Sequence, residues 1–258
     1  MSIFFVKNLK LPTVCIILGL LSLMFVELDR RAYNSDFYNS SSGNIEIIKS
    51  TSLSKEFIII GHGFAGSKEM MRQIAYDVTK AGSNAVLFDF IGHGSNQQKL
   101  VNEPTEITGT TQQLVTQLSN IINFIYEKFG DEINISLIGH SMASDIVVRA
   151  SADKRIKSVV AISPYSTGIT QDFPKDLLLI SGQFENHLRS HALQMVRTFK
   201  PEAKENTEYT NGKIRRKASF IENTGHVSVI YAPQTTKIIL DWLNLENYDR
   251  PIWKNQIA

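Results

Sequence analysis

Short apolar runs alternate with longer amphipathic stretches along most of this chain. Runs such as 56–60 (EFIII) and 176–180 (DLLLI) are nearly continuous in apolar residues, as parallel strands buried on both faces are. In 108–129 the apolar residues instead recur every three or four positions, which indicates a helix. The pattern predicts strands at 44–50, 56–60, 84–90, 133–138, 157–162, 176–180 and 218–221, and helices at 67–81, 108–129, 142–150, 186–199 and 228–245.

This alternation of strands and helices predicts an α/β fold. Right-handed crossovers between successive strands produce a mostly parallel, twisted sheet with helices on both faces. Ligands of such sheets bind beyond the carboxyl ends of the strands. The residues that directly follow each strand are therefore the candidates for chemistry.

The N-terminal segment has a different pattern. Residues 11–26 (LPTVCIILGLLSLMFV) carry no charge, whereas Lys7 and Lys10 precede them and Glu27 follows. A buried core helix, a cleaved signal peptide and a signal anchor all fit such a segment. Hydrophobicity on every side argues against the core helix, and the lack of a good small-x-small cleavage site argues against cleavage. We expect a signal anchor that contacts the membrane through residues 11–28.

This anchor divides the chain into three parts. We expect a signal anchor or signal peptide at 1–31, a Ser- and Asn-rich linker at 32–43, and one α/β domain at 44–258. The positive charges flank the apolar segment on both sides, so they determine its orientation poorly. The free amino terminus favours a cytoplasmic N-terminus, which places the domain outside the cytoplasm. The alternative is a secreted or periplasmic domain after signal cleavage.

Composition limits the partners of the domain. The net charge of +2 over 258 residues gives no reason to expect nucleic acid as a partner. Cys15 is the single cysteine, so no intrachain disulfide can form. We find neither a nucleotide-binding glycine loop nor a metal-spaced Cys/His cluster, and we expect no cofactor and no metal. The sequence does not determine the oligomeric state.

A candidate nucleophile follows the strand at 133–138. The sequence Gly139-His140-Ser141-Met142-Ala143 joins this strand directly to a helix, which is the context of a nucleophile elbow. A sharp turn there requires small residues two positions before and after the serine. An ordinary N-cap serine would explain the start of the helix, but not Gly139 and Ala143. We therefore expect Ser141 to be the nucleophile.

The serine needs a general base, and His226 has the best position for one. It follows the last predicted strand and precedes the last helix. His93 is the next candidate, and the ring of His140 should point away from the Ser141 hydroxyl. His187 and His191 fit a solvated helix face better than a metal pair. His62 completes the set of histidines and lies in a glycine-rich loop.

An acid must orient the base, and Glu185 follows the strand at 176–180. In the order Ser141, Glu185, His226 the acid lies between the nucleophile and the base, which is one of the known chain orders of such triads. Glu185 could instead only supply charge to the next helix, with Asp172 or Asp176 as the acid.

Two backbone amides must stabilise the oxyanion that forms on attack. We expect Met142 N–H to be one of them, because Met142 directly follows the nucleophile. The loop Gly61–Gly66 should provide the other through Phe64 N–H, with Ala65 N–H as the alternative. A plain glycine-rich turn is the alternative reading of this loop.

Together these segments resemble the α/β-hydrolase superfamily over residues 44–258. The matching pieces are HGF at 62–64, DFIGHGS at 89–95, GHSMA at 139–143, GQFE at 182–185 and TGH at 224–226. They are similar to the small esterases, lipases and serine aminopeptidase-like hydrolases that have an HGF-type oxyanion loop. The resemblance implies a serine hydrolase that forms an acyl-enzyme.

The chain departs from this family pattern in three places. Ala143 replaces the second glycine of the elbow, and only residues 163–175 occupy the usual position of a lid. A longer excursion lies between Glu185 and the last strand, and its basic hairpin either rims the site or is a solvated ribbon. Without a lid we expect an open site, with a small acyl ester as substrate. Amide or thioester hydrolysis is one alternative, and a catalytically silent binding protein is another.

Overall fold

The computed structural model describes residues 11–31, 33–51, 53–100 and 107–245. The chain forms two compact units, Met1–Asn34 and Ser35–Ala258.

The described part of the N-terminal unit contains helix α1 (Leu11–Arg31). Its segment Leu11–Leu28 has a mean hydropathy of 2.2 and is not buried against other parts of the chain. At 1.5 Å per residue the 18 residues of this segment extend for about 27 Å, close to the apolar thickness of a bilayer. The helix is thus long and apolar enough to be a membrane anchor, although a signal sequence has the same properties.

The second unit is built on one nine-stranded sheet with the order β1-β2-β4-β3-β5-β6-β7-β9-β8. Six neighbouring strands run parallel to one another: β4, β3, β5, β6, β7 and β9. The strands β1, β2 and β8 are antiparallel to their neighbours. The expected α/β fold with a mostly parallel sheet is confirmed. The strands are β1 (Ser35–Ser40), β2 (Gly43–Ile48), β3 (Glu56–Gly61), β4 (Asn84–Phe88), β5 (Asn134–His140), β6 (Ile156–Ile162), β7 (Asp176–Gly182), β8 (Glu208–Asn211) and β9 (Ile214–Ile221).

The register brings the carboxyl ends of the central strands together. Gly61, the last residue of β3, pairs with Gly139 near the end of β5, and Gly182 at the end of β7 pairs with Ile221 at the end of β9. Loops that leave these strands therefore begin at the same edge of the sheet, which we call the carboxyl edge.

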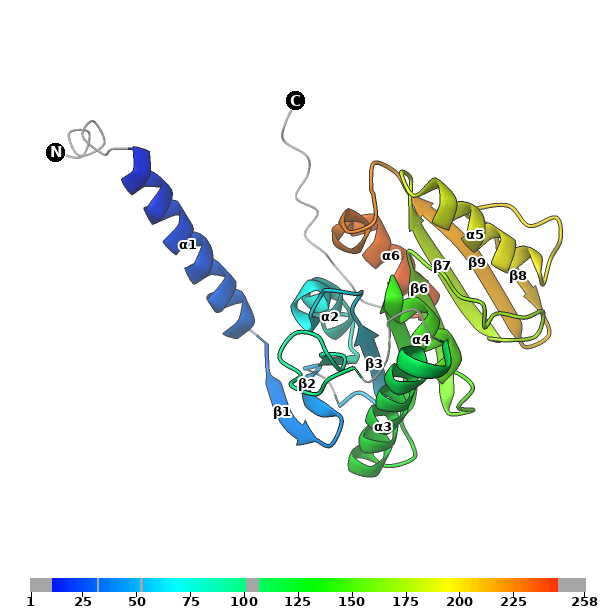
Figure 1. Cartoon of the computed structure of the whole chain (residues 1–258), viewed down its shortest axis with the longest axis horizontal. Helices are drawn as coiled ribbons and strands as arrows, with labels where there is room; N and C mark the ends of the chain where they lie inside the picture. The colour runs from blue at the N-terminus through cyan, green and yellow to red at the C-terminus, as the bar shows by residue number, and fades with distance from the viewer. Residues whose placement is uncertain (1–10, 32, 52, 101–106, 246–258) are drawn as a thin grey trace. The chain divides into compact units, whose positions relative to one another are not determined.

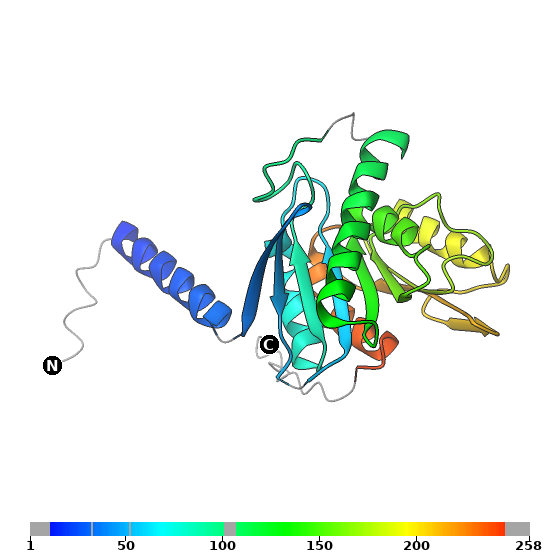
Figure 2. The same ribbon diagram turned by 90° about the horizontal axis from the view of Figure 1, so that it is seen from below.

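Helices cover both faces of the sheet (Figures 1 and 2). On one face α3, α4 and α5 contribute to a continuous apolar core with the strands. On the other face α2 packs against β2, β3 and β4 and touches α6. The helices are α2 (Arg72–Lys80), α3 (Gln112–Phe129), α4 (Met142–Ala150), α5 (Asn186–Arg197) and α6 (Pro233–Trp242).

Three of the predicted helices begin later than expected. A 3-10 turn, Lys68–Met71, precedes α2, and a π-helical turn, Ile107–Thr111, precedes α3. Another 3-10 turn, Ser228–Tyr231, comes before α6, which starts at Pro233. Proline fits the first turn of a helix but has no N–H for a hydrogen bond further along, so a single helix could not run through this position.

The prediction of a linker at 32–43 is wrong for most of that segment. Ser35–Ser40 forms β1 and pairs with β2, and Gly43 already belongs to β2. The Tyr38 ring packs on Phe124 of α3, with centroids 5.6 Å apart. Composition suggested a linker, but aromatic packing and pairing with an adjacent strand stabilise an edge strand there.

The basic hairpin in the excursion between Glu185 and the last strand does not rim the carboxyl edge. Helix α5 packs on β7 and β9, and β8 extends the sheet at its edge. The β8–β9 turn lies at the amino end of β9, opposite the carboxyl edge. Arg216 is fully buried and donates to Pro174 O at 3.0 Å, whereas β8 and the turn at Gly212 and Lys213 are mostly exposed, so the hairpin is packed along β9 and solvated along β8.

A buried ion cluster joins β2 to the first helix of the domain. Glu46 is 1% exposed and accepts hydrogen bonds from Arg72 at 2.7 and 2.9 Å and from Lys68 at 2.7 Å. Burial alone would raise the pKa of the Glu46 carboxyl, but the bonds from Arg72 and Lys68 outweigh it and lower the pKa to about 2. The carboxylate thus stays ionised inside the protein.

Acid should weaken the fold through Glu46. Because its pKa is depressed in the folded state, its contribution is present above the ordinary glutamate pKa and is lost as the pH falls from about 4.5 towards 2. The loss should amount to about 3 kcal/mol in the free energy of unfolding. Chemical denaturation at a series of pH values measures it.

Glu46→Gln should flatten this pH dependence and lower the stability at neutral pH, because Arg72 then lacks its buried partner. The matched control is Glu132→Gln, which removes an exposed pair with Lys55 and should change little. An unchanged slope below pH 4.5 in Glu46→Gln would contradict the assignment.

Candidate active site

Ser141 lies in a sharp turn between β5 and α4. Its backbone has φ 54° and ψ −116°, a strained conformation for a residue with a side chain. The turn is held on both sides, since Ser141 N–H donates to Ile162 O of β6 at 2.9 Å and Ser144 N–H donates to Ser141 O at 2.8 Å. The predicted strand–turn–helix geometry is present.

Small residues allow this turn to form. A Cβ at Gly139 would lie 2.4 Å from Ala143 O, so the backbones of β5 and α4 approach too closely for any side chain there. A Cβ at Gly61 would in turn lie 3.1 Å from the Ala143 Cβ. Ala143 is fully buried, and its methyl group fills the space between β3 and α4.

A chain of hydrogen bonds leads away from the serine. Ser141 Oγ lies 2.8 Å from His226 Nε2, and His226 Nδ1 lies 2.6 Å from Glu185 Oε1. A carboxylate only accepts hydrogen bonds, so Nδ1 carries the imidazole proton and Nε2 is free to accept from the Ser141 hydroxyl. The structure therefore brings together the three side chains that the sequence singled out.

Glu185 is held from the side opposite to His226. Its Oε2 accepts from Gly182 N–H at 2.6 Å and from the Ser163 hydroxyl at 2.8 Å, and the residue is 9% exposed. Sequence reasoning missed Ser163, whose only signal was its place directly after β6. The alternative acid Asp176 is engaged elsewhere, because Arg215 donates to it at 2.7 Å.

His226 reaches Ser141 from a distant strand. It follows β9, and β6 and β7 lie between β9 and β5 in the sheet. At about 4.8 Å per strand, roughly 14 Å must be bridged. At its base the loop is tied to β7, since Phe184 N–H donates to Thr224 O at 3.0 Å and Gln183 N–H donates to Ile221 O at 2.9 Å.

The glycine-rich loop after β3 comes next to the serine. A Cβ at Gly63 would lie 3.1 Å from the Ser141 Cβ, so this loop is in contact with the elbow. Gly63 O accepts from Gly66 N–H at 3.1 Å and from His62 Nδ1 at 2.8 Å. In a trans peptide the next N–H, that of Phe64, points away from this carbonyl. Because Gly63 O faces into the turn, the Phe64 N–H faces out of it, and Met142 N–H lies at the start of α4.

The other histidines of the carboxyl edge have different surroundings. His62 Nε2 accepts from Phe90 N–H at 3.0 Å, and burial lowers the pKa of its imidazole. His93 is 7% exposed, its Nδ1 lies 3.0 Å from Ile91 O, and its ring packs on His62 and Phe64. His191 on α5 stacks on the Tyr165 ring. His93 thus bonds to the loop after β4, whereas the histidine that bonds to Ser141 Oγ is His226.

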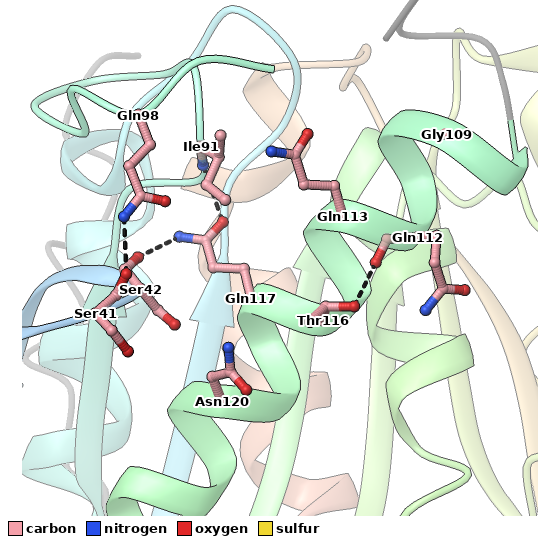
Figure 3. A pocket seen from close by; sticks show the side chains of 10 residues that line it. All are labelled: Ser41, Ser42, Ile91, Gln98, Gly109, Gln112, Gln113, Thr116, Gln117 and Asn120. Carbon is pink, nitrogen blue, oxygen red and sulfur yellow. Dashed lines mark hydrogen bonds between the residues drawn. The ribbon is translucent and has the colours of Figure 1, made fainter. Parts of the chain in front are cut away.

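A separate polar hollow lies between the β1–β2 turn and α3 (Figure 3). Its volume is about 340 Å³, and its lining includes Ser41, Gln98, Gln113 and Asn120. Gln117, also in its wall, accepts from Ile91 N–H at 2.9 Å and donates to Ser42 O at 2.8 Å. Ser141, Glu185 and His226 are not part of this wall, so the hollow is distinct from the serine site.

Comparison with known proteins identifies the family. Residues 56–231 match the family described as "alpha/beta hydrolase fold". The chain belongs to this family, and the resemblance noted from its motifs is confirmed. No curated protein sequence matches the chain significantly.

Many solved structures share the fold. A serine hydrolase without a lid from Xanthomonas campestris has a TM-score of 0.60 at 12% identity, covering 84% of this chain and 96% of that one. An esterase from Pyrococcus furiosus has a TM-score of 0.59 at 16% identity, covering 82% and 92%. A membrane phospholipase A described as a bacterial virulence factor has 0.59 at 14%, covering 88% and 91%. Family membership, with esterases among these structures, supports a hydrolase activity.

The contact between Gly139 and Ala143 should be essential to the turn. In Gly139→Ala the new methyl group would meet Ala143 O at 2.4 Å, so we expect a loss of stability of about 2–3 kcal/mol from overpacking. Gly225→Ala is the matched control, because a Cβ there meets nothing within 4 Å. Denaturant unfolding of the two variants measures the difference, and equal stabilities would show that the turn is not tightly packed.

Proposed function

We propose that this protein is a serine hydrolase that cleaves carboxylic esters through an acyl-enzyme. The observation that carries the proposal is the continuous hydrogen-bonded chain Ser141–His226–Glu185, at 2.8 and 2.6 Å, on the carboxyl edge of an α/β-hydrolase sheet. Such a chain makes a serine hydroxyl nucleophilic.

In the first half of the reaction Ser141 Oγ attacks the ester carbonyl carbon. The hydroxyl proton moves to His226 Nε2, and Glu185 stabilises the imidazolium through Nδ1. The carbonyl oxygen becomes an oxyanion, for which Met142 N–H and Phe64 N–H are our proposed donors, with Ala65 N–H as the alternative. When the tetrahedral intermediate collapses, the C–O bond breaks and the proton passes from His226 to the leaving alcohol.

The second half of the reaction removes the acyl group. Water loses a proton to His226 and attacks the acyl-enzyme carbonyl carbon, which forms a second oxyanion in the same hole. Collapse of this intermediate breaks the bond to Ser141 Oγ, and His226 returns the proton to the serine. The protein ends in its starting state, with an acid and an alcohol as products.

The substrate that fits this site best is a small acyl ester. Only residues 163–175 connect β6 to β7 at the usual position of a lid, and α5 packs on the sheet. An open site buries little acyl chain, and each buried methylene contributes only about 0.8 kcal/mol.

We also propose that α1 anchors the domain to a membrane, with the domain outside the cytoplasm. The apolar segment Leu11–Leu28 and its charged flanks support the anchor. Cleavage of the segment as a signal peptide would instead give a secreted or periplasmic enzyme. Protease accessibility in intact cells distinguishes these outcomes from a cytoplasmic domain.

Two other activities are compatible with the fold. Amide and thioester hydrolysis use the same intermediates, so a substrate panel that includes both separates them from ester hydrolysis. A catalytically silent binding protein would not require a serine held 2.8 Å from a histidine whose other nitrogen faces a carboxylate. This geometry favours the enzyme.

Loss of the nucleophile should abolish turnover. Ser141→Ala and His226→Ala should each lower kcat by more than roughly a hundredfold, and the double variant should lose no more than the worse single variant. Steady-state kinetics on a chromogenic short-chain ester measures this. Substantial turnover by Ser141→Ala would place the nucleophile elsewhere, and multiplicative losses would mean that the two residues act separately.

Loss of the carboxylate should be less severe. Glu185→Gln keeps the shape of the side chain but not its charge, so kcat should fall by up to roughly ten-thousandfold, less than on loss of the serine, while the protein stays folded. Asp176→Asn is the control, since Asp176 pairs with Arg215 away from the serine, and it should keep kcat. A neutral Glu185→Gln together with an inactive Asp176→Asn would reverse the assignment.

The length of the acyl chain provides a test of the open site. We expect kcat/KM to be highest for esters with short acyl chains and not to rise abruptly when the substrate forms micelles. Rates for a series of p-nitrophenyl esters measure both properties. A preference that still increases beyond about ten carbons, at roughly 0.8 kcal/mol per methylene, would indicate that the chain is buried after all.

A further inference from the structure

His140 holds the loop that carries the proposed base. It precedes Ser141, is 2% exposed, and its Nε2 lies 2.7 Å from the backbone carbonyl of His226. The two imidazole rings lie 5.0 Å apart between centroids and are tilted by 45°. A buried side chain at the end of β5 thus reaches the backbone of the residue that comes from β9.

The surroundings of His140 define its tautomer. The His226 carbonyl can only accept, so His140 Nε2 must carry a proton and donate it. The other ring nitrogen, Nδ1, is buried and has no hydrogen-bond partner within the described residues. A Cβ at Gly63 would come within 3.0 Å of it, so the Gly63 backbone closes this side of the ring. A proton on Nδ1 would have no acceptor, and burial lowers the pKa of His140, so the ring is neutral.

The loop depends on this contact because it spans the distance from β9 to β5. Its base is tied to β7 through Thr224 O, but its tip bears a His226 side chain that is 46% exposed. Gly225 bonds to Ser228 and Val229 within the same segment, at 2.9 and 3.1 Å, whereas the bond from His140 to His226 O, at 2.7 Å, joins the tip to the end of another strand. The Ser163 hydroxyl also approaches His226 O, at 3.5 Å, but makes its short bond to Glu185.

We propose that His140 is a positioning residue that fixes the His226 backbone over the serine by donating a hydrogen bond from Nε2. The inference rests on the proposed function, in which His226 takes up the proton of Ser141. Without this bond the His226 loop can shift at its tip, and the distance between Nε2 and Oγ is no longer held at its reactive value.

Neutral His140 also suits the charge that develops during the reaction. The charged or titratable groups that face it are His226 and Glu185 on the catalytic loops and His62 on the loop after β3. When His226 becomes an imidazolium, a second cation at His140 would repel it. A neutral donor holds the backbone without opposing the charge on the base.

Two variants separate the hydrogen bond from the shape of the side chain. His140→Gln places an amide N–H donor near the position of the imidazole Nε2, whereas His140→Met has similar length but no donor. We expect kcat to fall roughly tenfold to a hundredfold in His140→Met with KM nearly unchanged, because a small misplacement of a catalytic group has this effect. His140→Gln should recover most of the loss. Both are compared with wild type as the full chain in detergent, and thermal unfolding verifies the fold.

Two kinetic outcomes would contradict the proposal. Wild-type kcat in His140→Met would contradict it, because the donor would then be dispensable. Equal losses in both variants would contradict it too, since only the shape of the ring would matter.

A measurement on the wild-type chain remains valid if a variant fails to fold. After ¹⁵N labelling of the histidines, the His140 signals should show a neutral ring with the proton on Nε2 at neutral pH. A proton on Nδ1, or a titration near the ordinary histidine pKa, would contradict the proposal. This spectrum does not require turnover, so it tests the His140 contact separately from the proposed function. If Ser141→Ala stays active, the proposed function fails, but the spectrum can still support the His140 contact.

Discussion

The site depends on the close contact between the end of β5 and the start of α4. Because Gly139 leaves no room for a Cβ against Ala143 O, the chain turns within one residue and Ser141 takes a positive φ. This conformation is strained, and it persists because the bonds to Ile162 and Ser144 hold both sides of the turn. Its result is a hydroxyl at the carboxyl edge, next to the first amide of a helix.

The other groups of the proposed triad must meet the serine from other strands, and the sheet determines where each can come from. Glu185 leaves β7 and is fixed by Gly182 and Ser163, so its remaining oxygen faces His226. The His226 loop spans the longest distance and is the most exposed of the three. Its contacts with β7 at the base and with His140 at the tip restrict it at both ends. The proposed base is thus held by backbone contacts as well as by its own ring.

Much of this arrangement could be predicted from the sequence, because buried parallel strands are apolar and their ends are marked by glycines. Residues that follow such strands lie together at the carboxyl ends of the strands, and this rule selected Ser141, Glu185 and His226. The outermost strands of the sheet were harder to predict. Ser35–Ser40 looks like a linker until Tyr38 meets Phe124, and Arg216 looks solvated until its contacts with Pro174 are known.

Positioning residues were missed for a related reason. Ser163 and His140 act through contacts between segments that are 22 and 86 residues apart, and no local pattern encodes such contacts. His140 was expected only to point away from the serine hydroxyl. The structure adds that its Nε2 meets the His226 carbonyl, a partner that the sequence did not suggest.

Covalent labelling of the full chain tests the central claim most directly. An alkyl fluorophosphonate reacts with a serine only where a base removes its proton and an oxyanion hole stabilises the product. Peptide mapping by mass spectrometry should find a single phosphonyl adduct, on Ser141, formed at neutral pH. No adduct, or an adduct on another serine such as Ser95, would contradict the account.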